Sequence, residues 1–422
     1  MQKIEYKKIG ETLYEGELEN GLRIRVIPKS GFSSFYAVFG TKYGGAMRKF
    51  EIDGQTVDTP AGVAHFLEHK MFDLPNGDNA LSILSANGAD PNAFTSSGVT
   101  FYFFKCTESF EDNLRMLLHF VSTPYFTPET VEKEQGIIGQ EIQMGEDSPG
   151  SVIYYNLLGL LYDHHPIRDK IAGSIESISE ITDKTLYDCH KVFYAPSNMV
   201  LCIEGDVDPE AIFAIASEEL PKEKRSIPHA DFGEKESLMP AGREKTVEMA
   251  VSAPLFYIGA KLNPDAEIKE RLTGNLALRL LLGSSSPFYS RLYSEGLLNR
   301  DFDSELDFSA GTGTVIIGGE SSDPMKVYEE LNLEVERVLS EGFDDAYFSR
   351  SLKASIGGKL RLLEDFEEVC VSFAFALLDG YNFFDSFDLV NSITKEDCIG
   401  WIRENLAKDR LAISIINPLK EK

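Results

Sequence analysis

The segment that most constrains this 422-residue chain is Thr59–Phe72, which carries the pattern H-x-x-E-H at His65, Glu68 and His69. In an α-helix, side chains four residues apart lie on the same face, so His65 and His69 can direct two imidazoles at one point. Glu68 follows His65 by three residues and lies on nearly the same face. Two imidazoles beside a carboxylate supply two ligands for a hydrolytic zinc ion and a base for its water. Two surface histidines on an amphipathic helix would give the same pattern, so a third ligand must come from elsewhere.

A second predicted helix, residues 127–147, opens with Thr127-Pro128 and contains Glu134 and Glu141. Seven residues make two helical turns, so both carboxylates lie on one face. Charged residues mostly stay exposed, and a solvated helix face is the plain interpretation of this pair. A two-histidine motif that lacks an acidic ligand gives the pair a second interpretation. A glutamate oxygen is a normal third zinc ligand and leaves the fourth position for water.

The length of the chain predicts two domains, because single cores rarely grow beyond about 250–300 residues. The five cysteines are scattered and form no C-x-x-C pair, which argues against a disulfide framework and against a cysteine-based zinc site. No stretch of about 18 apolar residues occurs, and the start MQKIEYKKIGE has no apolar signal-peptide core. These features predict a cytoplasmic enzyme that does not act in a membrane.

The formal net charge of −27 argues against nucleic-acid binding, which needs a basic surface. An acidic field can attract basic substrates, and it can equally serve solubility alone.

Periodicity and turn signals predict an alternating series of strands and helices in the first half of the chain. Thr59 and Pro60 suit the N-cap and the first position of the motif helix. Ser109 is the predicted cap of a later helix, with Asp112 at the capping-box position. The predicted strands and hairpin segments are 12–27, 35–39, 88–106 and 198–204, and the further predicted helices are 80–86, 110–121, 151–162, 182–193 and 209–219.

The charged, proline-containing stretch 221–245 has the composition of a linker and predicts domains at 1–220 and 246–422. The second half weakly repeats the first. The run 180–184, a helix and Met199–Ile203 find a counterpart in 392–396, a helix and Leu411–Ile415. This pattern predicts a duplicated domain, although short apolar runs also resemble one another by chance. The corresponding helix near Gly274–Leu282 has no histidine, so only the first half can carry the metal.

Four sequence features carry a family resemblance: LENGLRI near the N-terminus, HFLEH at 65–69, GADPNAFTS at 88–96 and the E-x6-E pair at 134–141. With these features the chain resembles the pitrilysin/insulinase family of zinc metallopeptidases, the inverzincins. Within that family it is most similar to the branch of mitochondrial processing peptidase and its small bacterial relatives. The resemblance spans nearly the whole chain.

The resemblance implies an α+β fold of two homologous domains, each a mostly antiparallel sheet with helices on one face, forming a clam-like pair. It makes 1–220 a zinc-binding peptidase domain and 246–422 a homologous domain without the metal motif. It also implies a Zn²⁺ cofactor and individual roles. The implied metal ligands are His65, His69 and Glu141, the catalytic base is Glu68, the accessory carboxylate is Glu134, and the peptide-binding edge strand contains Asn92, Ala93, Phe94 and Thr95.

The sequence departs from the family at one place. Active members carry an Arg and a Tyr in the second domain that contact the substrate. Here the stretch Ser290–Asn299 is shortened, the Tyr position falls on Asn299, and the Arg is absent. Arg291 and Tyr293 lie nearby but do not match these positions.

The resemblance predicts a zinc endopeptidase that hydrolyses peptides bound in extended conformation. The alternative is a partner-dependent or non-catalytic subunit of a heterodimeric peptidase that holds peptides or assists assembly. The expected partners are a peptide or small-protein substrate and either a paralogous subunit or a second copy of the chain.

Overall fold

The computed structural model describes residues 1–420. The chain forms two compact units that interleave along the sequence. Unit 1 comprises residues 1–142, 169–232 and 360–384, and unit 2 comprises 143–168, 233–359 and the chain from 385 onward. Each unit has its own hydrophobic core. Within the described residues, no helix combines the length and apolar character needed to cross a bilayer.

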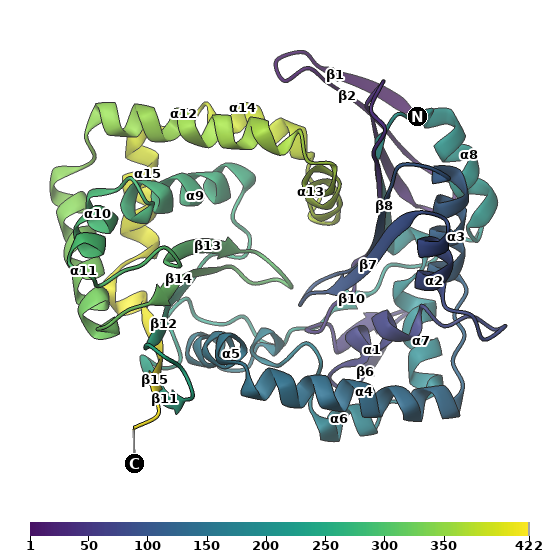
Figure 1. The fold of residues 1–422 in the computed structure, drawn as a ribbon, viewed down its shortest axis with the longest axis horizontal. Helices are drawn as coiled ribbons and strands as arrows, with labels where there is room; N and C mark the ends of the chain where they lie inside the picture. Colours follow the sequence, from purple (N-terminus) through teal and green to yellow (C-terminus); the bar gives the residue numbers. More distant parts are fainter. Residues whose placement is uncertain (421–422) are drawn as a thin grey trace. The chain divides into compact units, whose positions relative to one another are not determined.

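A seven-stranded sheet organises unit 1, and strand β7 lies at one of its edges (Figure 1). All neighbouring strands are antiparallel except β3 and β9. In spatial order the strands are β1 (Gln2–Tyr6), β2 (Glu11–Glu17), β3 (Arg23–Pro28), β9 (Met199–Gly205), β4 (Phe35–Thr41), β8 (Thr100–Cys106) and β7 (Ala89–Thr95).

The main core of unit 1 lies between this sheet and a layer of helices. Alternate residues of the strands, such as Phe39 and Phe104, pack there against Leu114 and Leu117. The helices of this unit's first half are α1 (Val63–Lys70), α2 (Ala80–Ala86), α3 (Phe110–Ser122), α4 (Pro128–Asp147), α6 (Ile175–Ser179), α7 (Asp183–Phe193) and α8 (Pro209–Glu219). A small separate sheet has the order β10 (His229–Ala230), β5 (Lys49–Ile52) and β6 (Gln55–Asp58).

Unit 2 contains a five-stranded sheet in which only β11 and β15 are parallel. In spatial order its strands are β11 (Glu244–Met249), β15 (Ala412–Pro418), β12 (Leu255–Lys261), β14 (Thr314–Glu320) and β13 (Asp303–Asp307). The remaining helices of the chain are α5 (Pro149–Leu161), α9 (Ile268–Leu282), α10 (Pro287–Ser294), α11 (Pro324–Glu341), α12 (Asp345–Leu362), α13 (Phe366–Leu378), α14 (Ser386–Val390) and α15 (Lys395–Asn405).

The two sheets have the same topology. The order β3-β9-β4-β8-β7 in unit 1 corresponds to β11-β15-β12-β14-β13 in unit 2, and the parallel pair has the same place in both. Helices α7 and α15 precede the corresponding strands β9 and β15, and each begins with a capping box, at Thr182 and at Thr394. The predicted α+β fold of two similar domains is therefore confirmed.

The compact units differ from the predicted contiguous domains by the exchange of two helices. Their boundary passes between Phe232 and Gly233, inside the predicted linker, but α5 belongs to unit 2 and α13 to unit 1. Helix α13 packs on β9 and β4, and α5 packs on β15 and β12. Each lies on the sheet face opposite the main core, because Phe375 of α13 contacts Phe101 rather than a core residue and Leu157 of α5 packs beside Gly259.

The reason for this second helix layer lies in the central strands. All seven residues of β9 are buried, so its continuous apolar run requires cover on both faces. Each sheet therefore carries one helix on the face opposite its main core, whereas the prediction placed helices on one face only.

The motif helix begins at Val63, three residues later than the predicted first helical position at Pro60. The Thr59 hydroxyl donates to the carbonyl of Arg48 at 2.9 Å and does not cap a helix. Gly62 follows with φ of 101°, and a Cβ there would lie 2.7 Å from the carbonyl oxygen of Ala172. The chain must complete this left-handed turn before the helix can start. Ser109 lies at the predicted N-cap position of α3, but it has φ of 54° and its side chain does not make the predicted capping hydrogen bond.

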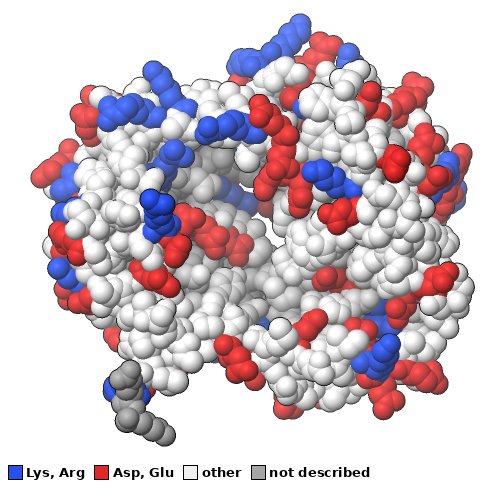
Figure 2. Space-filling view, in the orientation of Figure 1, with Lys and Arg blue, Asp and Glu red and all other residues white. Residues whose placement is uncertain are grey.

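Charged side chains of both signs are interspersed on the face of the molecule drawn in Figure 2. Among the described residues visible there, carboxylates and basic groups alternate without forming a continuous basic stripe.

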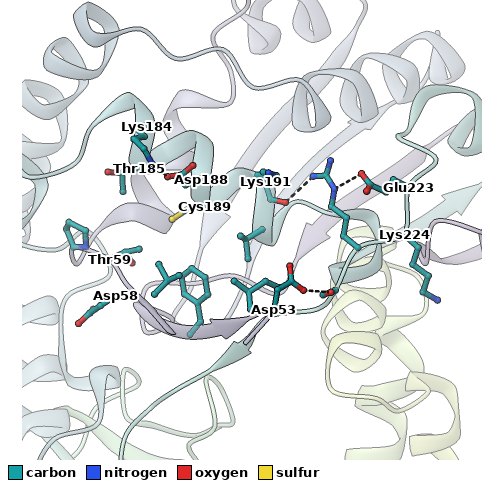
Figure 3. A pocket seen from close by; sticks show the side chains of 17 residues that line it. Asp53, Asp58, Thr59, Lys184, Thr185, Asp188, Cys189, Lys191, Glu223 and Lys224 are labelled. Carbon is teal, nitrogen blue, oxygen red and sulfur yellow. Dashed lines mark hydrogen bonds and ion pairs between the residues drawn. The ribbon is translucent and has the colours of Figure 1, made fainter. Parts of the chain in front are cut away.

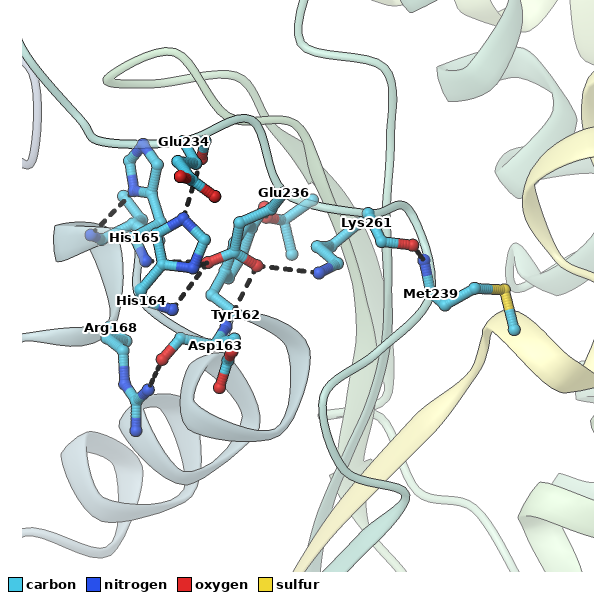
Figure 4. Close-up of polar contacts among 12 residues, drawn as sticks. Tyr162, Asp163, His164, His165, Arg168, Glu234, Glu236, Met239 and Lys261 are labelled. Atoms are coloured by element: carbon cyan, nitrogen blue, oxygen red, sulfur yellow. Dashed lines mark hydrogen bonds and ion pairs between the residues drawn. The ribbon is translucent and has the colours of Figure 1, made fainter.

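Within unit 2, Glu236 of the predicted linker is held at the end of α5 (Figure 4). Its carboxylate accepts the backbone N–H groups of Asp163, His164 and His165 at 3.0, 2.8 and 2.8 Å, and the ammonium of Lys261 at 2.9 Å. The side chains of Glu236 and Lys261 are only 8% and 4% exposed. Burial alone would raise the pKa of Glu236, but these hydrogen bonds outweigh it and lower the pKa to about 2.

Glu236→Ala should destabilise the protein by about 3–5 kcal/mol at pH 7, because it leaves the Lys261 charge buried without a partner. Urea unfolding measures the effect, with Glu234→Ala on the same segment as an exposed control. The folded pKa lies below the ordinary value of 4.5. The difference between wild type and variant should therefore persist above pH 4.5 and shrink as the pH falls toward 2. Equal stability of the two proteins at pH 7 would contradict this role.

Candidate metal centre

Helix α1 and the part of α4 that belongs to unit 1, residues 128–142, carry the candidate site. Helix α1 buries Val63, Phe66 and Leu67 in the core, which leaves the histidines and the glutamate of the motif partly exposed on another face. Helix α4 is anchored by one apolar face that includes Ile138 and Ile142. Its Glu134 and Glu141 project from a different face, as their seven-residue spacing predicts.

The two histidines converge on Glu141. Its Oε2 atom lies 3.7 Å from His65 Nε2 and 3.6 Å from His69 Nε2. The three ligand atoms lie within 4.8 Å of one another, and no other such group of His, Cys, Asp or Glu occurs in residues 1–420. Zinc bonds of about 2.0–2.2 Å in a tetrahedron separate neighbouring ligand atoms by about 3.4 Å. The donor set and its spacing therefore fit a zinc ion after a small contraction.

Glu134 orients His69. The Nδ1–H group of His69 donates to Glu134 Oε1 at 2.9 Å, which turns Nε2 toward Glu141. Burial alone would lower the pKa of His69, but the hydrogen bond with Glu134 and the charge of Glu141 outweigh it and raise the pKa. A carboxylate on the far nitrogen of a metal-binding imidazole fixes its tautomer and orientation. Glu134, for which the family resemblance implies an accessory role, thus lies against the ring of His69.

His65 has the opposite electrostatic environment. Burial, together with the neighbouring His69, lowers its pKa to about 4, so its imidazole is neutral at pH 7. The two rings lie with their centroids 4.6 Å apart. A neutral imidazole is the form that binds a metal, and His65 therefore needs no deprotonation at neutral pH.

Glu68 lies on the same helix and is held by the edge strand β7. The hydroxyl of Thr95 donates to Glu68 Oε2 at 2.5 Å. Burial raises the pKa of Glu68, and the hydrogen bond from Thr95 opposes part of this effect. A general base with a raised pKa holds its proton better near neutral pH, which suits it to accept and return a proton.

The predicted substrate-binding residues all lie on β7, which pairs with β8 along one side only. Of the four, Thr95 contacts Glu68 directly. Asn92 is exposed, and its side chain accepts the N–H of Ala93. Phe94 packs beside Phe101 and Phe375, with ring centroids 5.3 and 6.3 Å away. The free edge of β7 thus carries these residues beside the candidate base.

Two polar groups behind Thr95 were not predicted from the sequence. Thr100 Oγ1 lies 3.2 Å from Thr95 Oγ1 and donates to the carbonyl of Tyr43 at 2.9 Å. The pairing of Thr95 with Thr100 follows from the short Ser96–Val99 turn of the β7–β8 hairpin. That hairpin was predicted, and its register could have indicated Thr100.

In unit 2, the side chains near the missing Arg and Tyr positions are engaged locally. Arg291 forms an ion pair with Glu330 at 2.8 Å. Asn299, which the family resemblance aligns with the Tyr, donates to Glu320 at 2.9 Å. Both side chains are therefore held by contacts within unit 2.

A cavity of 890 Å³ lies elsewhere in unit 1, between the β5–β6 hairpin and α7 (Figure 3). Phe50, Ile52 and Val57 are among its apolar lining residues, and Asp58 and Lys191 are among the charged ones. None of the five candidate metal-centre residues lines it. This cavity is therefore distinct from the candidate site.

Known proteins match the chain over nearly its whole length. Residues 54–174 match the model for insulinase (peptidase family M16), and residues 180–355 match the model for the peptidase M16 inactive domain. An uncharacterized zinc protease of Bacillus subtilis, YmfH, is 39% identical over 98% of this chain and 99% of its own length.

Two solved structures give the same result for the fold. An M16-like peptidase from Alicyclobacillus acidocaldarius has 32% identity and a TM-score of 0.91, and the match covers 97% of this chain and 99% of that one. A Helicobacter pylori protease shares the fold, with 20% identity and a TM-score of 0.84 over 96% of this chain and 99% of that one. The two-domain fold, the family models and the extent of the Bacillus match agree, and the chain belongs to the pitrilysin/insulinase family, peptidase family M16.

Proposed function

We propose that this protein is a zinc-dependent endopeptidase that hydrolyses peptides bound in extended conformation along β7. The observation that carries the proposal is the convergence of His65 Nε2 and His69 Nε2 on Glu141, with Glu68 beside them on the same helix. Two imidazoles, one carboxylate and a neighbouring base form the donor set of a catalytic zinc site with an open position. The zinc-protease names of the relatives support the same activity.

Each residue has a distinct task in the proposed reaction. Bound zinc would supply a Lewis acid and make a water molecule more acidic. Glu68 accepts the proton of that water at its carboxylate and delivers it to the leaving amine. Glu134 keeps His69 Nε2 directed at the metal position. The free edge of β7 binds the peptide main chain as an added strand, which tolerates many side chains.

A second candidate function is a peptide-holding subunit that depends on a paralogous partner for cleavage. The observation in its favour is Asn299, which stands at the family's substrate-contacting Tyr position and bonds to Glu320 instead. The Arg of that pair has no counterpart in this sequence. Because the metal-ligand set and the base are all present, we propose the catalytic function first.

Metal analysis and a peptide assay on the purified full-length protein test these proposals. We expect one zinc per chain, cleavage of unstructured peptides, loss of cleavage with a chelator and its return with added zinc. Full zinc occupancy without cleavage would favour the peptide-holding function. Failure to bind zinc at all would contradict the proposed site.

A further inference from the structure

A chain of polar contacts joins the candidate base to the β7–β8 hairpin. Glu68 Oε2 accepts from Thr95 Oγ1 at 2.5 Å, Thr95 Oγ1 lies 3.2 Å from Thr100 Oγ1, and Thr100 Oγ1 donates to the carbonyl of Tyr43 at 2.9 Å. Thr100 and Tyr43 are fully buried, whereas Thr95 is partly exposed. The hydroxyl that contacts Glu68 is therefore attached to a rigid interior.

The hydrogen bond from Thr95 restrains the Glu68 carboxylate, which helix α1 alone leaves free to rotate. Helix α1 fixes the Cα of Glu68, but three rotatable bonds separate that atom from the carboxylate. Thr95 is stiff by comparison, because a β-branched side chain has few χ1 rotamers. Its backbone is paired with Thr100 in the register of the hairpin. The Glu68 carboxylate is thus held by a strand as well as by its own helix.

That strand is also the one on which a peptide would bind. Thr95 is the last residue of β7, whose other edge is not paired in the described structure. A peptide that pairs with β7 takes its register from the same backbone that holds Thr95. The same strand therefore positions both the peptide and the base, and a shift of β7 would move both together.

We propose that Thr95 is a positioning residue, whose hydroxyl holds the Glu68 carboxylate in register with a peptide bound on β7. This inference rests on the proposed peptidase function. It assigns Thr95 a role different from the substrate contact predicted from the sequence. Accurate placement of a reacting group is worth a large factor in rate, since an error of about 1 Å can cost about 100-fold.

The test compares Thr95→Val, which keeps the shape and removes the hydroxyl, with Thr95→Ser, which keeps the hydroxyl. We expect Thr95→Val to lower kcat by about 10- to 100-fold with KM and zinc content unchanged, and Thr95→Ser to restore most of kcat. Thr56→Val on the exposed strand β6 is the matched control. If Thr95→Val does not fold, Thr95→Ala replaces it.

A double-mutant cycle shows whether Thr95 acts through Glu68. In the Glu68→Gln background, Thr95→Val should cause little further loss of residual kcat, because the group it positions is already gone. An unchanged kcat in Thr95→Val, or a change confined to KM, would overturn the positioning role while the wild-type activity still supports the proposed function. Absence of cleavage by the wild-type protein would instead overturn the proposed function, and this inference with it.

Discussion

Glu68→Gln should lower kcat for peptide cleavage by about 10²- to 10⁴-fold, the usual contribution of a general acid–base residue, and leave one zinc per chain. The amide has nearly the same shape as the carboxylate and can still accept the hydrogen bond from Thr95, but it cannot take a proton from water. Glu68 is not among the three converging ligand atoms, so the metal should remain bound.

Kinetic assays and metal analysis on the same preparations show whether kcat falls while the zinc content is retained. Glu132→Gln on the exposed surface of α4 is the matched control and should behave as the wild type. A Glu68→Gln protein that cleaves peptides at the wild-type rate would show that another group is the base. A variant that loses zinc would place Glu68 among the metal ligands instead.

His65→Ala should abolish stoichiometric zinc binding and, with it, peptide cleavage. The change removes one of only three ligand atoms, and the neighbouring residues offer no fourth His or Cys within the described cluster.

Glu134→Gln should have a smaller effect, with zinc affinity about 10- to 100-fold weaker, because it loosens the orientation of His69 without removing a ligand.

Competition with a chromogenic chelator gives both zinc affinities. The control is His119→Ala, which changes an exposed histidine on α3 of the same unit. The expected order of affinity is wild type and His119→Ala first, then Glu134→Gln, then His65→Ala. Zinc binding that survives in His65→Ala would contradict the proposed ligand set.

Much of the candidate site could be predicted because its geometry is local. The spacing of His65 and His69 on one helix, and of Glu134 and Glu141 on another, fixes which side chains share a face. The resemblance to a known family then assigned separate roles to the two glutamates, and in the structure Glu141 faces both Nε2 atoms while Glu134 bonds to Nδ1 of His69.

The features that the sequence did not indicate depend on distant contacts. The late start of α1 results from the approach of Gly62 to Ala172, more than a hundred residues away along the chain. The exchange of α5 and α13 results from sheets that need cover on a second face, and no local pattern specifies which helix provides it. The sequence pattern predicts only a strand residue at Thr100, and its place beside Thr95 follows from the register of the hairpin.

The contacts behind Glu68 also accommodate the proton that the base receives during turnover. A threonine hydroxyl has one hydrogen, and with Glu68 ionised those of Thr95 and Thr100 point to Glu68 and to the Tyr43 carbonyl. The gap between the two threonine oxygens then contains no hydrogen. Once Glu68 is protonated, it can donate to Thr95, and Thr95 can turn its own hydrogen toward Thr100. Rotation of a single hydroxyl would thus let the base be hydrogen-bonded in both charge states without moving a heavy atom.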